Sequence, residues 1–171
     1  MEKQLSLLTS IITTKADVLT IHIDGAARGN PGPAGAGVII ERAGALPIKK
    51  GIFLGEKTNN QAEYFALAYA LFLIKNLSLP EETYNQIELI IYSDSELLIR
   101  QMNKVYKVKD KNLALIKSNI DAALHGIHHT FIHVTRENNK EADQLANHAI
   151  DKKIKIPTEF LKILANCGFK Y

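Results

Sequence analysis

The segment Ile87–Tyr92 is apolar except at Glu88, a pattern typical of a central strand covered on both faces of a sheet. The preceding segment Ala62–Ile74 is apolar almost all round, so we expect a helix that is buried against that sheet. A strand of this kind needs helices packed over it. Together the two segments predict an α/β fold.

Three strands are expected before that helix. Val18–Ile23 is β-branched and apolar with a period of two, and it ends at Asp24. The glycine- and proline-rich segment Gly25–Gly35 predicts a turn. Gly37–Glu41 predicts a second strand, and Gly51–Leu54 predicts part of a third. The short connections favour an antiparallel meander.

Helical patterns dominate the rest of the chain, and their order predicts a mixed five-stranded sheet with helices on both faces. We expect a helix that Thr58 and Asn59 can cap and that runs to about Lys75, and further helices at Ser95 to about Asn103, Leu113–Ala123 and Lys140–Lys152. A strand is expected at Thr130–Val134, and one helical turn in the tail to Tyr171.

Length and composition predict one globular domain with a full core. The chain has 171 residues, of which 46% are hydrophobic and 23% are charged. We expect an N-terminal extension at 1–17, a core domain at 18–153 and a C-terminal tail at 154–171. The net charge of +3 permits a polyanionic partner but does not require one.

Cysteine usage and hydropathy indicate the compartment. The single cysteine, Cys167, excludes both an intramolecular disulfide framework and a cysteine-based zinc site. No apolar stretch has the length needed to span a membrane, and the apolar N-terminal run has no cleavage pattern after it. We therefore expect a cytoplasmic monomer with no membrane partner.

Four of the 18 acidic residues lie where an apolar segment meets a turn or a helix start: Asp24, Glu63, Asp94 and Asp143. Such positions can converge, and four clustered carboxylates cannot all stay ionised without cations. Oxygen ligands without cysteine or histidine suit hard divalent ions, Mg²⁺ or Mn²⁺. The four residues therefore indicate a two-metal phosphodiester hydrolase.

Each acid also has a structural interpretation. Asp24 suits an Asx turn, and Asp94 suits a helix cap. Glu63 and Asp143 suit the first turns of helices, where the helix dipole stabilises negative charge. No single position distinguishes these roles from metal binding; the joint context of the four does.

The segments DGAARGNPGPAGAG, TNNQAEY, YSDSELL and NKEADQLAN carry the four acids in order. Together they resemble type 1 ribonuclease H, which cuts RNA in RNA–DNA hybrids, over roughly Leu19–Lys152. The resemblance implies the ribonuclease H fold, with strand order 3-2-1-4-5. It implies a metal-dependent endoribonuclease that leaves 5′-phosphate and 3′-hydroxyl ends. It also implies that the four acids are catalytic and bind two Mg²⁺ (or Mn²⁺) ions per site.

The resemblance further implies substrate contacts. Asn30 and Asn60 resemble residues that contact the nucleic acid backbone or 2′-hydroxyls, and Thr58 resembles one that holds a phosphate of the DNA strand. Turn formation and helix capping are the alternative roles of these side chains. Arg136 is the fourth candidate, since it lies in a connection where many family members carry a histidine and this chain has none.

Other departures point to a short-loop subgroup of the family. His133 falls within a strand pattern, so we expect a structural role for it. The basic protrusion of several members is reduced to 104–111, in which lysines surround Tyr106. Glu96 stands where others have glutamine. The segment His125–His129 is expected to be a surface turn, because no carboxylate or cysteine accompanies it.

Three alternatives are considered at this point. One is a fragment of a reverse transcriptase or a transposase-like enzyme, although the compact length and the N-terminal methionine favour a standalone protein. The other two concern function. The same fold could act also on double-stranded RNA, because both duplexes have A-form shape and 2′-hydroxyls. The chain could instead be a catalytically weak module that binds hybrids. Retention of all four acids argues against this last alternative, since a surface that only binds phosphates does not require a negative cluster.

Overall fold

The computed structural model describes residues 17–77 and 86–168, so the expected N-terminal extension lies outside the described residues except at Asp17. The elements follow one another as β1 (Asp17–Ala27), β2 (Gly32–Arg42), β3 (Ile48–Lys57), α2 (Asn59–Lys75), β4 (Ile87–Ser93), α4 (Glu96–Met102), α5 (Lys111–Ala123), β5 (His128–His133), the 3₁₀ turn η1 (Arg136–Asn138), α6 (Lys140–Lys152) and α7 (Thr158–Asn166).

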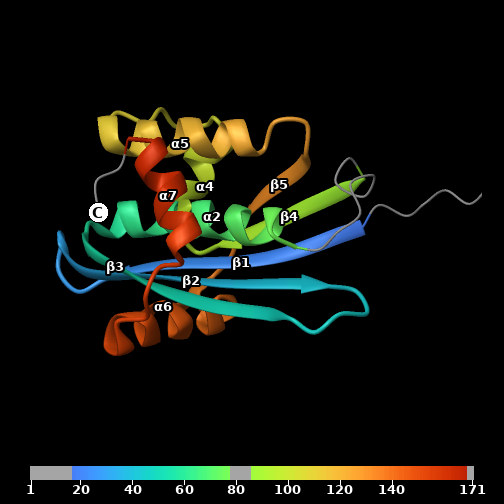
Figure 1. The fold of residues 1–171 in the computed structure, drawn as a ribbon. Coiled ribbons are helices and arrows are strands. Elements are labelled where there is room, and N and C mark those ends of the chain that lie inside the picture. Colours follow the sequence, from blue (N-terminus) through green and yellow to red (C-terminus); the bar gives the residue numbers. More distant parts are fainter. Residues whose placement is uncertain (1–16, 78–85, 169–171) are drawn as a thin grey trace, which may run out of the picture.

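The strands form one mixed sheet in the order β3-β2-β1-β4-β5, which confirms the predicted topology (Figure 1). β1 pairs antiparallel with β2, and β2 pairs antiparallel with β3. β4 runs parallel to β1 on one side and parallel to β5 on the other. The parallel pairing of β1 with β4 ends at His22 and Tyr92, so the residues that follow this pair in the two strands lie at the same edge of the sheet.

Helices cover both faces of this sheet, as Figure 1 shows: α6 lies on one face, and α2, α4, α5 and α7 lie on the other. The second face of β4 is less covered than its sequence predicts. Ile87, Leu89 and Ile91 are buried, whereas the alternate residues of the strand keep partial exposure. The reason is that α6 packs over β1, β2 and β3. On that face the ring of Tyr92 stacks on His22 of β1.

Helix α2 is the central buried helix, as its apolar sequence predicts. Thr58 caps it: its hydroxyl accepts from the backbone N–H of Gln61, and the Gln61 side chain accepts from the N–H of Thr58. Ten of its 17 residues are buried, and one of these is Glu63. A charged residue in such a helix needs a specific partner, because burial of an unpaired carboxylate is costly.

Helix α6 approaches the sheet closely because glycines and alanines meet at the interface. A Cβ atom added at Gly37 would lie 2.1 Å from the carbonyl oxygen of Ala142, and one at Gly35 would lie 2.4 Å from that of Ala146. Ala142 and Ala146 are themselves fully buried. The backbone of the helix therefore rests directly on the backbone of β2.

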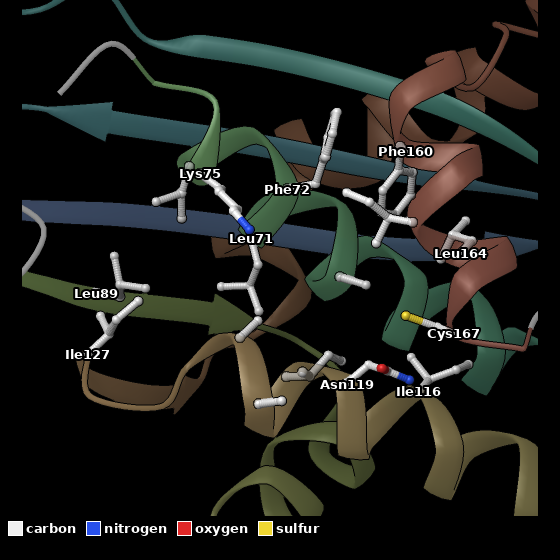
Figure 2. Close-up of a pocket in the computed structure, with 16 residues that line it drawn as sticks. Leu71, Phe72, Lys75, Leu89, Ile116, Asn119, Ile127, Phe160, Leu164 and Cys167 are labelled. Atoms are coloured by element: carbon white, nitrogen blue, oxygen red, sulfur yellow. The ribbon is translucent and has the colours of Figure 1, made fainter. Parts of the chain in front are cut away.

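The C-terminal region forms a nine-residue helix, α7, where the sequence suggests only one turn. Phe160 and Leu164 of this helix are buried, and the Phe160 ring packs 5.2 Å from Tyr69 and 5.1 Å from Phe72 between ring centres. A cavity of about 480 Å³ lies where α7, α2 and α5 meet over Leu89 (Figure 2). Its walls are mainly apolar.

Two predictions about local structure are wrong. The segment Gly25–Gly35 is mostly strand, since β1 extends to Ala27, β2 begins at Gly32, and only Arg28–Pro31 turns. Glycine there serves close packing rather than a long turn. The segment His125–His129 is not wholly a turn, because β5 already begins at His128 through pairing with β4. None of the described helices is both long enough and apolar enough to cross a membrane.

The contact between α6 and β2 makes a prediction about stability. Gly37→Ala should lower the free energy of unfolding by about 3 kcal/mol, at the upper end of overpacking costs, because the new methyl group meets backbone that cannot rotate away. Gly44→Ala is the control. Gly44 has open space around it and a φ of 75°, so strain alone should cost about 1 kcal/mol. Equal losses in denaturant titrations of the two variants would contradict this packing argument.

Candidate active site

Asp24 and Asp94 lie at the matching ends of two parallel neighbours. The register pairs His22 with Tyr92, so Asp24 and Asp94 each stand two residues beyond the same pair. Asp24 is 5% exposed and remains within β1, whereas Asp94 follows the last residue of β4 and is partly exposed. The pairing of the strands thus fixes the separation of these two carboxylates.

Glu63 reaches the same place from helix α2. The helix and β1 touch through Gly25, where an added Cβ atom would lie 2.1 Å from the backbone nitrogen of Glu63. Glycine is required here by this close approach. The backbone N–H of Gly25 also donates a hydrogen bond to the Glu63 carboxylate. Backbone contact therefore sets the position of Glu63 relative to Asp24.

The three carboxylates form one tight cluster. Asp24, Glu63 and Asp94 each offer an oxygen, and these oxygens all lie within 4.8 Å of one another. Asp24 and Glu63 are both buried. Among the described residues, Glu63 Oε2 has no hydrogen-bond partner. A buried acceptor of this kind, facing other acceptors, is suited to a cation rather than to a further protein donor.

Burial and mutual repulsion disfavour ionisation of the cluster. Burial raises the pKa of Asp24, and the negative charges of Asp94 and Asp143 add to this effect, so that the pKa reaches about 8. Burial also raises the pKa of Glu63 well above its usual value, and the charges of Asp24 and Asp94 act in the same direction. The guanidinium of Arg136 opposes both shifts. The site thus binds protons strongly, and a divalent cation would replace them.

Asp143 lies on α6, on the other side of the cluster. It is exposed, and it is not part of the group whose oxygens lie within 4.8 Å. Its charge nevertheless acts on Asp24. Asn147, one turn later, donates to the side-chain oxygen Oδ1 of Asp143 at 3.1 Å. Three of the four predicted acids therefore converge directly, and the fourth comes from α6, which lies on the face of the sheet opposite α2.

Two basic side chains border Asp94. Arg136 Nε lies 3.5 Å from Asp94 Oδ2, and the Arg136 side chain is 91% exposed. His133 ends β5, as its strand pattern predicts, and its Nε2 lies 3.2 Å from the carbonyl oxygen of Asp94. Arg136 can therefore move toward a ligand, whereas His133 supports the backbone of Asp94.

The other three predicted substrate contacts gather at the start of α2. Thr58 is the N-cap, and Asn60 is exposed in the first turn. Asn30 comes from the turn between β1 and β2, and its Oδ1 accepts a hydrogen bond from the backbone N–H of Asn59 at 3.0 Å. The capping and turn roles are thus real for Thr58 and Asn30. They also bring three polar side chains to the same exposed helix end.

Asn139 is a site residue that the sequence does not reveal. It is 2% exposed and donates to Asp94 Oδ1 at 3.0 Å and to the carbonyl oxygen of Ile23 at 2.9 Å. Its neighbour Asn138 is exposed. Both asparagines precede α6 and look alike as capping residues, so only the direction of the side chain distinguishes them.

The carboxylate cluster lies apart from the large cavity of Figure 2. None of the residues that line this cavity is an acid, and Cys167 and Lys75 are among them. The cluster instead faces the surface at the carboxyl ends of β1 and β4. Asp24 and Glu63 are buried there, and Asp94 is the partly exposed member of the cluster.

Comparison with known proteins identifies relatives of this chain. A family model described as reverse transcriptase-like matches residues 22–149. Ribonuclease HI of Halobacterium salinarum is 37% identical over 132 residues, which cover 76% of this chain and 63% of that protein. Ribonuclease H of a Sulfurovum species is 32% identical, and the match covers 78% of this chain and 91% of that protein. Three mycobacterial proteins match over only 35% of their length, so the chain spans one part of some relatives.

Solved structures agree with these sequence relatives. LC11 ribonuclease H1 in complex with an RNA/DNA hybrid is 40% identical, with a TM-score of 0.69 over 78% of this chain and 97% of that one. Ribonuclease H1 of Halobacterium salinarum is 31% identical and has a TM-score of 0.70, and the match covers 79% of this chain and 98% of that one. The sheet order, the convergent carboxylates and these matches all lead to one assignment: the chain belongs to the type 1 ribonuclease H family.

Proposed function

We propose that the protein is a metal-dependent endoribonuclease that hydrolyses the RNA strand of RNA–DNA hybrids to 5′-phosphate and 3′-hydroxyl products. The observation that carries this proposal is the convergence of Asp24, Glu63 and Asp94. The named activity of the ribonuclease H relatives supports it. The hybrid-bound LC11 structure supports the choice of substrate.

The residues fit a divalent metal centre. The cluster offers only carboxylate oxygens, and Glu63 Oε2 is buried without a partner among the described residues. Hard cations such as Mg²⁺ or Mn²⁺ prefer such ligands. We propose that Asp24, Glu63, Asp94 and Asp143 are catalytic and hold two ions. When bound, the ions would supply Lewis-acid activation of water and of the leaving oxygen.

The protein side chains have distinct tasks in this mechanism. Asp24 would be the central ligand, since its carboxylate lies beside those of Glu63 and Asp94 and is also within reach of the charge of Asp143. Glu63 is held by the backbone of Gly25, which keeps its carboxylate at a fixed place without neutralising it. Ligands that are held rigidly in this way reduce the reorganisation needed when charge develops on the phosphate.

The start of α2 is the proposed contact for the nucleic acid. Asn30, Thr58 and Asn60 lie together there, at the positive end of the helix dipole. Such a site binds phosphate, and the amide side chains can reach 2′-hydroxyls, which distinguish RNA from DNA. Arg136 adds an exposed positive charge beside Asp94.

The activity is tested with labelled RNA–DNA, RNA–RNA and DNA–DNA duplexes, each with Mg²⁺, with Mn²⁺ and with a chelator. The RNA strand of the hybrid should be cut only when a divalent ion is present. Asp24→Asn should reduce kcat by more than about 100-fold, which exceeds the usual effect of residues that only orient metal ligands. Asp121→Asn is the matched control, because Asp121 pairs with Lys117 on the surface of α5.

Each other outcome has a definite meaning. Cleavage of RNA–RNA would extend the substrate to double-stranded RNA. Binding of the hybrid without any cleavage would identify a hybrid-binding module. Full activity of Asp24→Asn would refute the assignment of the site even if the wild-type protein cuts the hybrid.

The raised pKa of Asp24 predicts how metal-free stability depends on pH. Between its usual pKa of 3.8 and the folded value of about 8, the folded protein keeps a proton that the unfolded chain has released. The stability from this group is therefore fully present below pH 4 and is lost as the pH rises through 8, by up to about 1.4 kcal/mol per pH unit. Denaturant titrations with chelator should show this fall.

Asp24→Asn is the comparison for that experiment. The variant should lose a large part of the decline and be the more stable protein at pH 8 in chelator. Some decline should persist, because the pKa of Glu63 is raised as well. Parallel stability profiles for the two proteins would show that Asp24 is ionised without cost, contrary to its burial.

Arg136 should contribute to binding rather than to chemistry. Arg136→Ala should raise the KM for the hybrid several-fold with little change in kcat, and the slope of log affinity against log salt should shrink by about 1. Arg42→Ala removes the same charge from a surface pair with Asp17 and should change neither quantity. An unchanged KM in Arg136→Ala would remove Arg136 from the substrate site.

A further inference from the structure

Asn139 connects three of the elements that carry the proposed catalytic acids. Its amide nitrogen donates to the carbonyl oxygen of Ile23, the residue before Asp24, at 2.9 Å. The same nitrogen donates to Asp94 Oδ1 at 3.0 Å. Its backbone carbonyl oxygen accepts from the backbone N–H of Asp143 at 3.2 Å. Asn139 thus touches β1, the end of β4 and α6 at once.

We propose that Asn139 is a positioning residue that holds the Asp94 carboxylate in register with Asp24 and Asp143, and thereby sets the metal affinity of the cluster. The inference rests on the proposed function, because it assumes that these acids bind divalent ions. It assigns to Asn139 an effect exerted through Asp94 rather than contact with the reacting atoms.

The orientation of the amide follows from its surroundings. Both partners of Asn139, the carbonyl oxygen of Ile23 and the carboxylate of Asp94, are acceptors. A flipped amide would place its oxygen against both of them, so the nitrogen must face the cluster. A neutral donor also fixes the carboxylate without cancelling its charge. The charge of Asp94 therefore stays available to a cation.

The remaining atom of the amide shows that helix capping does not explain this residue. Asn139 Oδ1 is buried and has no partner among the described residues. As the residue at the N-cap of α6, Asn139 makes no side-chain capping bond. An asparagine selected for helix stability would turn its oxygen toward the free N–H groups of the helix. Here the side chain gives up that bond and donates to the site instead.

No other common side chain would replace this amide well. Aspartate would set a second carboxylate against Asp94 and a carbonyl oxygen, which adds repulsion to a site where ionisation is already disfavoured. Alanine would leave the carbonyl of Ile23 and one oxygen of Asp94 without their donor. Serine keeps one donor on a shorter arm and can serve only one of the two acceptors.

The test measures Mn²⁺ binding to the full chain by calorimetry without nucleic acid, and kcat and KM with the hybrid. Asn139→Ala should weaken Mn²⁺ binding by about 10- to 100-fold, the range for residues that orient metal ligands. It should lower kcat while KM for the hybrid stays within about twofold, because the residue does not touch the substrate. Asn139→Ser should fall between alanine and the wild type. Asn119→Ala, which removes an amide bonded within α5, should leave both readouts unchanged.

The outcomes separate the two proposals. A folded Asn139→Ala protein with wild-type Mn²⁺ affinity and kcat would overturn the positioning role and leave the nuclease proposal standing. If alanine prevents folding, a folded Asn139→Ser protein with unchanged Mn²⁺ affinity would overturn it equally. A wild-type protein that binds Mn²⁺ but cuts no hybrid would refute the nuclease proposal, and weaker Mn²⁺ binding by Asn139→Ala would then still support the positioning role.

Discussion

The parallel pairing of β1 with β4 is the constraint on which the rest of the site depends. It brings together two acids that are 70 residues apart in the chain, so that Asp24 and Asp94 stand beside each other (94 − 24 = 70). Helix α2 connects the antiparallel half of the sheet to β4 and brings Glu63 to the same point. A different neighbour for β1 would separate Asp94 from the pair of Asp24 and Glu63, which the contact at Gly25 holds together.

The sequence predicts the architecture because its apolar patterns have distinct periods. Ile87–Tyr92 is identifiable as a central strand, and the apolar helix before it is identifiable as a buried one. The convergence of Asp24, Glu63 and Asp94 follows from those elements, since Asp24 lies where the parallel pairing of β1 ends, Asp94 follows β4, and Glu63 lies in the first turns of α2. Local sequence patterns are enough to predict a site when its residues lie near the ends of elements that the fold brings together.

Local patterns fail where tertiary contact decides the outcome. Gly32 to Gly35 has the composition of a turn, yet it is strand, because α6 packs on Gly35 and the pairing with the neighbouring strands supplies the hydrogen bonds. Asn138 and Asn139 are equivalent in sequence, and only the packed structure turns one of them into the site. The type of a residue limits the roles that are open to it, and its tertiary contacts determine which of these roles it takes.

The contact at Gly25 has a consequence for how the protein tolerates sequence change. The spacing of Asp24 and Glu63 is set where main chain meets main chain, and no side chain lies between them at that point. Core residues elsewhere can therefore drift in size through compensating substitutions without altering that spacing. The size of core side chains can therefore change during evolution, whereas any side chain at position 25 would collide with the backbone of Glu63.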